Sequence, residues 1–240
     1  PMGRYKSFDQ RLIQWVSQVG SMGRSGIHAP DQFISSAQLV QEMRLFKSQF
    51  EINLMRKAAE ISASAHVNAM KIASPGIKEY ELEAELISTF VSGGARSAAY
   101  PSIVGGGRNG CILHYIDNNS QINDGDLVLI DAGAEYEFYA ADITRTFPIN
   151  GRFTQDQKIV YEIVLEAQMA AIEAVKPGNC WNDPHEAAVK VITKGLVDMQ
   201  VLSGNLNKLI ADESFRPYFM HRTGHWLGMD VHDVGEYKVD

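Results

Sequence analysis

The sequence predicts an α+β fold built from two similar halves that share one sheet. The order long helix, Pro-Gly pair, second helix and strands occurs twice along the chain. The two pairs, Pro75-Gly76 and Pro177-Gly178, lie about 100 residues apart, whereas the repeats of solenoids are roughly 20–50 residues long. Duplication into two α+β halves therefore explains the pattern better than a repeat array, and a ligand site between the halves is plausible.

The composition is that of an ordinary globular protein without a strongly basic surface. Of the 240 residues, 45% are hydrophobic and 21% are charged, so the chain can bury a core without disulfides. The formal net charge is -7 and the isoelectric point is near 5.5. These values disfavour nucleic acid as the main partner, because phosphate binding needs a basic patch.

Neither a membrane protein nor a disulfide-stapled secreted protein is indicated. No apolar run approaches the roughly 18 residues of a membrane helix, and the first residues lack the apolar stretch of a signal peptide. Cys111 and Cys180 form no Cys-x-x-Cys pair, so the sequence predicts neither a zinc–thiolate site nor a disulfide framework. We expect a cytoplasmic location.

Residues 1–44 are too mixed and too few to form a domain of their own. The stretch RLIQWVSQV predicts a short amphipathic helix, and SMGRSGIHAPDQF predicts a loop rich in Gly, Pro and Ser. The stretch AQLVQEMRLF is interpreted as a strand or as the end of a linker.

The first half begins with a capping box formed by Ser48 and Glu51. A helix is expected to follow and to end at Pro75-Gly76. A second helix is predicted over residues 78–92. The inward face of the first helix is rich in small residues, which permits close approach to a sheet, and is expected to contain Ile52, Met55, Ala59, Ser62, Ala65, Ala69 and Ile72. The inward residues of the second helix are expected to be Leu82, Leu86 and Phe90, before the stop at Gly93-Gly94.

Strand-like runs follow these helices. Residues 100–105 and 111–116 predict two strands, and Asp124-Gly125 predicts a turn. The run LVLID, residues 127–131, is typical of a buried strand that ends in a carboxylate. Residues 138–149 are predicted to be its hairpin partner.

The second half repeats the helical pattern. Thr154 and Gln157 form another capping box, and the helix that follows is expected to end at Pro177-Gly178. A further helix is predicted over residues 184–199. The inward residues of the long helix are expected to be Val160, Ile163, Val164, Ala167, Ala171 and Val175.

Asp131 and Asp142 form a candidate pair of facing carboxylates. If the hairpin turn centres on Tyr136-Glu137, the two aspartates are direct cross-strand partners, with Cβ atoms roughly 4.5–5.5 Å apart. Two such carboxylates repel unless one is protonated or a cation lies between them. The alternative is a turn residue and a surface charge, and the spacing alone leaves both open.

Three histidines lie close together in HRTGHWLGMDVHDVG, at His221, His225 and His232. A zinc-protease helix of the form H-E-x-x-H is not predicted, because Arg222 replaces the general base and the glycines disfavour a helix. We expect extended backbone that directs His221 and His225 into one cleft, where the glycines between the histidines would let a peptide come near. Neutral imidazole binds divalent metals, and an unligated histidine can exchange a proton near neutral pH. The isolated histidines His28, His66 and His185 are expected to be structural.

These motifs together resemble a known family. The stretches ILHY, LVLIDAGAEY, ADITRTFP and HRTGHWLGMDVHDVG, with the helices that end in Pro-Gly, look like the catalytic domain of Xaa-Pro aminopeptidases. This domain belongs to the pita-bread metallopeptidases, which also include prolidase and methionine aminopeptidase. The resemblance covers about residues 40–240, and HWLGMDVHDVG favours the bacterial aminopeptidase P branch.

The resemblance implies a pita-bread α+β fold, with two pseudo-symmetric halves around a curved antiparallel sheet, and a two-metal hydrolase. Asp131, Asp142 and His225 would be metal ligands, with Asp142 bridging two divalent ions. The ions would be Mn²⁺, with Co²⁺ or Zn²⁺ as alternatives, and would hold a bridging hydroxide. The residues that would line the substrate cleft and assist proton transfer are His114, His221 and His232.

The resemblance also implies parts that this sequence does not contain. Two further glutamate ligands, one of them the proposed general base, are expected beyond Asp240, so the catalytic domain of residues 45–240 is expected to be incomplete at its C-terminus. Residues 1–44 would be the tail of a larger N-terminal domain and its linker. We therefore expect these 240 residues alone to bind metal weakly and to be inactive.

The expected substrate is a peptide with proline at the second position, from which the enzyme removes the first residue. The expected assembly is a dimer or tetramer, with neither nucleic acid nor membrane as a partner. The alternatives are prolidase, which is restricted to dipeptides, methionine aminopeptidase, and a non-enzymatic pita-bread binding module. The presence of Asp131, Asp142 and His225 counts against the last of these.

Overall fold

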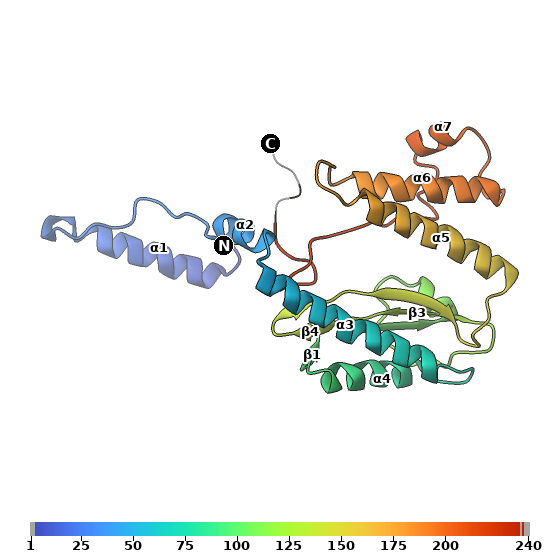
Figure 1. The fold of residues 1–240 in the computed structure, drawn as a ribbon. Coiled ribbons are helices and arrows are strands. Elements are labelled where there is room, and N and C mark those ends of the chain that lie inside the picture. Colours follow the sequence, from blue (N-terminus) through green and yellow to red (C-terminus); the bar gives the residue numbers. More distant parts are fainter. Residues whose placement is uncertain (1–2, 236, 238–240) are drawn as a thin grey trace. The chain divides into compact units, whose positions relative to one another are not determined.

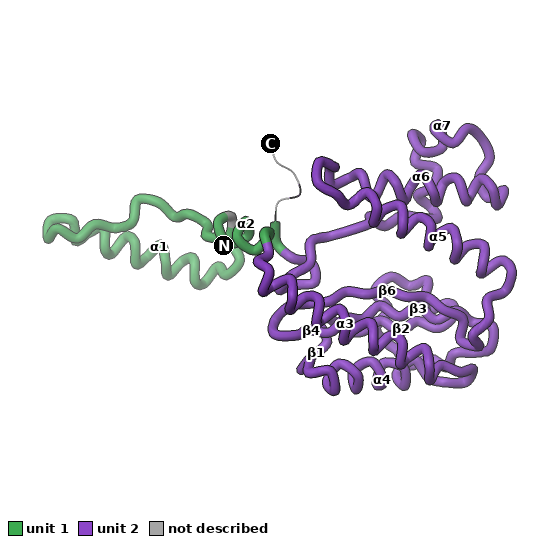
Figure 2. The backbone as a smooth tube through the Cα atoms, in the orientation of Figure 1, with its two compact units in different colours: residues 1–46, 234–236 green, residues 47–233, 237–240 purple. Residues whose placement is uncertain are grey.

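The structure is a computed structural model that describes residues 3–235 and 237 (Figure 1). Contacts between Cα atoms divide the chain into two compact units (Figure 2). The smaller unit contains residues 1–46 and 234–236, and the larger contains residues 47–233 and 237–240. In the described residues, no helix has both the length and the apolar composition needed to cross a membrane.

The smaller unit is helical. Helix α1, Lys6–Gly20, confirms the predicted amphipathic helix, and the short 3-10 helix η1, Gly23–Ser25, follows it. The stretch 37–46 is helix α2, Ala37–Leu45, so its interpretation as a strand or linker end is wrong. Ala, Leu, Gln, Glu, Met and Arg are all strong helix formers, and this local preference decides the outcome. The description of residues 1–44 as the tail of a larger domain stays a prediction.

Helix α3, Gln49–Ile72, begins at the predicted capping box. The Ser48 hydroxyl accepts the Glu51 N–H at 3.4 Å, and the Glu51 carboxylate accepts the Ser48 N–H at 2.7 Å. The buried face of α3 is rotated slightly from the predicted inward face, since the predicted residues Ala59 and Ile72 are exposed. The buried residues of α3 are Ala58, Ile61, Ser62, Ala65, His66 and Ala69.

Helix α4, Glu79–Ser92, packs against α3 and completes the helical layer of the first half. Leu82, Leu86 and Phe90 are buried in the main core as predicted. The sheet side of this core is formed by Val104, Val128, Ile130 and Ile149.

The strands form two small antiparallel sheets. The first contains β2, Ile103–Gly106, β3, Leu127–Asp131, and β6, Thr144–Pro148, in the order β2-β3-β6. The second contains β1, Ser97–Ala98, β4, Ala134–Tyr136, and β5, Tyr139–Ala140, in the order β1-β4-β5.

The hairpin after β3 turns one residue later than predicted. Tyr136 pairs with Tyr139, so the loop is Glu137-Phe138, and both loop residues have positive φ, 48° and 71°. This backbone is that of a type I′ turn. Asp131 therefore faces Thr144 rather than Asp142. Asp142 stands two residues before Thr144, at the diagonal position, from which a side chain can still reach its neighbour.

The predicted strand over residues 111–116 is wrong. Residues 107–111 form the 3-10 helix η2, Gly107–Cys111, and the chain then turns. Side chains rather than a neighbouring strand hold this segment, since the Tyr115 hydroxyl donates to Glu79 and the Asn118 side chain bonds to the edge of β2.

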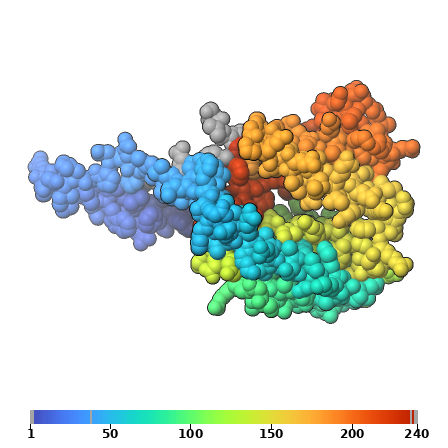
Figure 3. Space-filling view, viewed as in Figure 1, coloured from blue at the N-terminus to red at the C-terminus, as the bar shows by residue number. Residues whose placement is uncertain are grey.

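The second half contains helices α5, Gln155–Ala174, α6, Asp183–Asp198, and α7, Leu206–Ala211. The capping box at Thr154 and both predicted helices are confirmed, and residues 155–235 contain no strand. Figure 3 shows α3 and α4 in blue-green and α5 and α6 in yellow and orange on separate parts of the larger unit's surface.

Helix α5 packs against α6, and this contact buries only one side of it. Of its predicted inward residues, Ala167 and Ala171 are buried and Ile163 is half-buried. Val160, Val164 and Val175 are exposed, because α6 covers one side of the helix only.

Gly133 offers a direct test of the turn between Asp131 and the hairpin. An added Cβ would lie 1.7 Å from the carbonyl oxygen of Ala141, which is backbone and cannot swing away. We expect Gly133→Ala to lower the free energy of unfolding by at least about 2 kcal/mol in urea titrations. Gly224→Ala is the control, because nothing lies within 4 Å of its Cβ position. Equal stability of the two variants would contradict this packing.

Candidate active site

Asp131 and Asp142 meet at one tyrosine hydroxyl. The Tyr100 hydroxyl lies 2.6 Å from Asp131 Oδ1 and 3.0 Å from Asp142 Oδ1. A hydroxyl has a single proton, so it can donate to only one carboxylate at a time. The shorter contact identifies Asp131 as the acceptor, and the second carboxylate then faces an oxygen lone pair. A proton or a cation near Asp142 would remove this repulsion.

The environment of these groups opposes the ionisation of Asp131. Burial raises the pKa of the Asp131 carboxyl, and the neighbouring Asp142 charge adds to the rise, whereas hydrogen bonds from Tyr100 and Thr144 oppose it. Burial, followed by both carboxylates, also raises the pKa of the Tyr100 hydroxyl. The two half-buried carboxyl groups therefore lie in a site that disfavours two negative charges.

His225 approaches the same carboxylate pair from the other end of the chain. Its Nε2 atom lies 3.0 Å from Asp142 Oδ2, and its Nδ1 atom lies 2.9 Å from the carbonyl oxygen of Trp226. A carbonyl oxygen can only accept, so Nδ1 must carry a proton. If the imidazole is neutral, Nε2 then directs a lone pair at the Asp142 carboxylate. Only a proton or a cation bound between the two atoms makes this contact favourable.

This donor set fits a divalent metal ion. Two donors bound to one ion at about 2.1 Å and at right angles to each other lie about 3 Å apart, the separation between His225 Nε2 and Asp142 Oδ2. Histidine ligands usually donate their other ring N–H to a carbonyl or carboxylate, as Nδ1 does here. However, no three His, Cys, Asp or Glu side chains converge on one point anywhere in the described residues. The described residues therefore supply part of a metal site.

The other three predicted site histidines are all exposed. The His232 ring stacks on that of His225, with centroids 4.0 Å apart and planes 11° apart. His221 has Nδ1 2.9 Å from the carbonyl oxygen of Arg222, which leaves Nε2 facing solvent. His114 has positive φ, 56°. Within residues 3–235 and 237, no hydrogen bond joins His114 or His221 to either carboxylate, so the structure groups only Asp131, Asp142, His225 and His232.

The segment that carries His225 and His232 is irregular, neither the excluded helix nor the expected strand. It lies beside the hairpin because the Ala140 N–H donates to the carbonyl oxygen of Gly228 at 2.8 Å. A Cβ on Gly228 would lie 2.1 Å from Asp233 Oδ2, so this glycine makes room for the Asp233 carboxylate. Its interpretation as clearance for a peptide is therefore replaced by a packing role.

Tyr100 is the site residue that the sequence did not reveal. The pairing of Ile103 with Asp131 brings the chain just before β2 to the end of β3. The sequence predicted a strand that begins at residue 100. It did not predict the pairing of this strand with β3, and only that pairing places Tyr100 beside Asp131.

Helix α3 holds the backbone that follows Asp131. The Ser62 hydroxyl accepts the Ala134 N–H at 2.9 Å, and His66 Nε2 donates to the carbonyl oxygen of Ala132 at 3.1 Å. His66 is only 2% exposed, and burial lowers its pKa. Its contacts agree with the structural role expected for this histidine, since it supports the turn and touches neither carboxylate.

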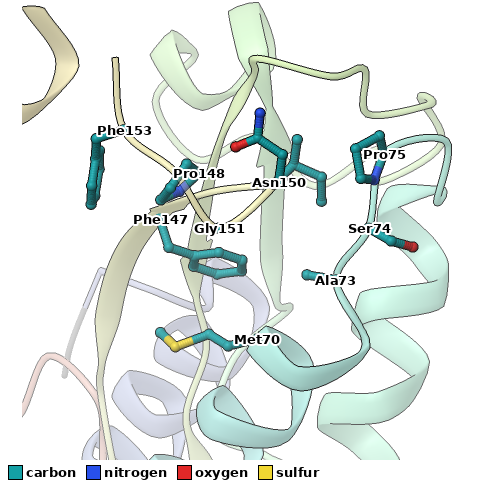
Figure 4. A pocket seen from close by; sticks show the side chains of 10 residues that line it. Met70, Ala73, Ser74, Pro75, Phe147, Pro148, Asn150, Gly151 and Phe153 are labelled. Carbon is teal, nitrogen blue, oxygen red and sulfur yellow. The ribbon is translucent and has the colours of Figure 1, made fainter. Parts of the chain in front are cut away.

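A separate pocket of about 560 Å³ lies between the end of α3 and the end of β6 (Figure 4). Met70, Phe147 and Phe153 supply much of its lining, and Ser74 and Asn150 are its polar side chains. No ionisable side chain lines it, so it offers no acid, base or metal ligand.

Comparisons with known proteins identify the family of this chain. Residues 53–240 match metallopeptidase family M24. The chain belongs to this family. It is 46% identical over 238 residues to the Xaa-Pro aminopeptidase of Escherichia coli and 50% identical over 202 residues to that of Haemophilus influenzae. These matches cover 99% and 84% of this chain.

Solved structures of M24 enzymes share the fold. The Pseudomonas aeruginosa aminopeptidase PepP superposes with a TM-score of 0.96 at 54% identity over 99% of this chain. A zinc-substituted aminopeptidase P of Escherichia coli in complex with product has a TM-score of 0.94 at 46% identity over 98% of this chain. The predicted pita-bread α+β fold is thereby confirmed. The chain spans about half the length of these relatives, 54% for both solved structures.

The raised pKa of Asp131 predicts how an M24 chain without metal responds to pH. The folded state binds the Asp131 proton more tightly than the unfolded state, so stability falls as pH rises from the ordinary value of 3.8 through the raised one. Asparagine does not ionise and can still accept from Tyr100. We therefore expect Asp131→Asn to raise the Tm at pH 7 in the presence of a chelator, with a gain that disappears below pH 3.8.

The control for this experiment is Asp124→Asn, at an exposed aspartate that accepts a hydrogen bond from Asn150. Thermal melts from pH 3 to 8 measure both variants. If Asp131→Asn does not raise the Tm at pH 7, or raises it equally at every pH, the raised pKa of Asp131 is not the cause.

The Lys47–Asp233 ion pair is predicted to stabilise the histidine segment. Lys47 Nζ lies 2.9 Å from Asp233 Oδ2, with 12% and 1% of the two side chains exposed. Hydrogen bonds to buried charged groups contribute about 1.5–3 kcal/mol, so Lys47→Met should lower the unfolding free energy by that amount. Lys194→Met removes the exposed Lys194–Asp198 pair and should cost less than about 0.5 kcal/mol. Similar losses in urea titrations would show that burial does not strengthen the pair.

Proposed function

We propose that the protein is a metal-dependent Xaa-Pro aminopeptidase, which removes the first residue of peptides that have proline at the second position. The proposal is supported by membership of the M24 family, by relatives named Xaa-Pro aminopeptidase, and by the likeness to aminopeptidase P structures. This activity and substrate are proposed for the whole protein, because the relatives are about twice as long as this chain.

The observation that carries the metal proposal is the contact between His225 and Asp142. The Trp226 carbonyl fixes a proton of His225 on Nδ1, so in the neutral imidazole Nε2 would present a lone pair 3.0 Å from a carboxylate oxygen, as a metal ligand requires. Hard carboxylate oxygens with one imidazole are ligands suited to Mn²⁺, Co²⁺ or Zn²⁺. The preference for two Mn²⁺ ions comes from the family resemblance, and the zinc-substituted form of the Escherichia coli relative supports zinc as an alternative.

In this proposal Asp131, Asp142 and His225 would hold the metal ions. Bound divalent ions would supply a hydroxide nucleophile and polarise the scissile carbonyl. The Tyr100 hydroxyl orients the Asp131 carboxylate, and the Trp226 carbonyl orients the imidazole. Two glutamates beyond Asp240 would complete the ligand set, as the resemblance implies.

The remaining histidines would handle the substrate. His114, His221 and His232 are exposed, so a peptide could reach their side chains, although Nδ1 of His221 already contacts the Arg222 carbonyl oxygen. His232 is the best supported of the three, because its ring lies parallel to that of His225 at 4.0 Å. From this position it can donate to the carbonyl oxygen of a bound peptide or exchange a proton with it.

Prolidase and methionine aminopeptidase remain alternatives, because the carboxylate and imidazole donors do not distinguish them. A non-enzymatic binding module is disfavoured because the proposed metal donors are present and two of them are in contact. The expected dimer or tetramer and the expected cytoplasmic location stay predictions.

The test compares cleavage of an Xaa-Pro dipeptide, a longer Xaa-Pro peptide and a Met-Ala peptide by the full-length protein with Mn²⁺. We expect the longer Xaa-Pro peptide to be cleaved best. Removal of a proposed metal ligand should cost more than the 10- to 100-fold typical of residues that support ligands, so Asp142→Asn should lower kcat/KM by more than about 100-fold. Chelation should abolish activity, and added Mn²⁺ should restore it.

Asp124→Asn, which makes the same chemical change at an exposed turn, is the matched control and should remain within about twofold of the parent. Preferred cleavage of the dipeptide or of Met-Ala would select one of the alternative enzymes. Full activity of Asp142→Asn, or activity unaffected by chelation, would overturn the proposed mechanism.

A further inference from the structure

A buried carboxylate outside the candidate site organises the segment that contains His114. Glu79 is 0% exposed, yet its carboxylate accepts four hydrogen bonds of 2.7–2.9 Å. Oε1 accepts from the Gly106 N–H and the Asn109 side chain, and Oε2 accepts from the Tyr115 hydroxyl and the Ser120 N–H. Each oxygen thus uses both lone pairs, which compensates for the burial of a charge.

The four donors come from both ends and the middle of one loop. Residues 107–120 leave the sheet at the end of β2 and return beside the start of α4, where the Glu79 N–H donates to the Ser120 carbonyl at 3.0 Å. A second buried side chain, Asn118, bonds to the Val104 N–H and the Ser102 carbonyl. The buried side chains of Glu79 and Asn118, rather than pairing with a strand, therefore hold the loop in place.

His114 lies at the exposed side of this fixed loop. It precedes Tyr115, which is 8% exposed and donates to Glu79 at 2.7 Å. Its backbone has φ of 56°, a conformation that is unfavourable for a residue with a side chain and persists only where its surroundings enforce it. The residue after His114, Tyr115, is hydrogen-bonded to Glu79. A change at Glu79 that moves Tyr115 should therefore also move the His114 imidazole.

We propose that Glu79 is a positioning residue, which holds the loop of residues 107–120 so that His114 is presented to the peptide. This inference rests on the proposed function of His114 and extends it to a residue that touches neither metal nor substrate. Burial and the number of donors distinguish Glu79 from the exposed carboxylates around it. Glu81, two residues later on the same helix, caps α4 by accepting the Lys78 N–H at 2.8 Å, and within the described residues no hydrogen bond joins it to the loop.

The decisive variant is Glu79→Gln, which keeps the side chain's size. An amide has one oxygen and one NH₂ group, so it can accept from one pair of donors and must direct its own N–H groups at the other pair. Glu81→Gln is the matched control, since it makes the same change in the same helical turn. Tyr115→Phe removes one donor and should give a smaller effect than Glu79→Gln.

Activity of the full-length protein separates positioning from general destabilisation. Misplacement of a substrate-contacting group by about 1 Å can cost about 100-fold, so we expect Glu79→Gln to lower kcat/KM by about 10- to 100-fold, and Glu81→Gln to stay within about twofold. If Glu79 acts through His114, the double variant Glu79→Gln/His114→Ala should be within about twofold of His114→Ala alone. Losses that multiply in the double variant would overturn the proposal.

Hydrogen exchange tests the anchoring without any assay of activity. Amides of residues 107–120 should exchange faster in Glu79→Gln than in the parent or in Glu81→Gln, and unchanged exchange would overturn the proposal. If the parent cleaves no Xaa-Pro peptide, the proposed function fails and the exchange result alone decides whether Glu79 holds the loop. If the parent is active but the two Gln variants behave alike, only the inference about Glu79 fails.

Discussion

Two carboxylates that both contact one tyrosine hydroxyl are the central constraint of this site. Asp131 and Asp142 are both within hydrogen-bond distance of Tyr100, and His225 Nε2 lies 3.0 Å from Asp142 Oδ2. Without a proton or cation, this arrangement brings like charges and lone pairs together in a partly buried space. Family membership and chemistry lead to the same conclusion, since such a cluster is costly in a purely structural role and useful in a metallopeptidase.

Contacts from several elements hold the segments that carry this cluster. Gly133 permits the chain to turn immediately after Asp131, and Ser62 and His66 of α3 hold the turn from behind. The histidine segment is fixed to the hairpin by the Ala140–Gly228 hydrogen bond and to the start of α3 by the Lys47–Asp233 ion pair. The contacts are short and specific, so small backbone changes should affect the donors together. Glu79 gives the loop of His114 the same kind of support from a different part of the fold.

Local signals in the sequence were sufficient for helices α3 to α6, whereas α2 was missed and the ligand roles of Asp131, Asp142 and His225 were proposed only from the family resemblance. The capping boxes at Ser48 and Thr154 and the Pro-Gly stops act within a few residues, so they can be recognised without the fold. The hairpin turn was placed one residue too early, which shifted the predicted partner of Asp131 by two residues, because the type I′ turn uses Glu137-Phe138 instead of the usual Asn or Gly. Residues 111–116 were mistaken for a strand because a distant carboxylate, Glu79, replaces the missing strand partner. Tyr100 depended on strand register, which no local pattern encodes.

The most direct test of the central claim is the state of the His225 ring nitrogens, observed by ¹⁵N NMR of histidine-labelled protein before and after Zn²⁺ addition. The proposed cation site predicts a proton on Nδ1 of His225 throughout, because the Trp226 carbonyl accepts it, and a large shift of Nε2 alone when zinc binds. The shift should be absent in Asp142→Asn. An unchanged Nε2 resonance at saturating zinc, or zinc bound through Nδ1, would contradict the account.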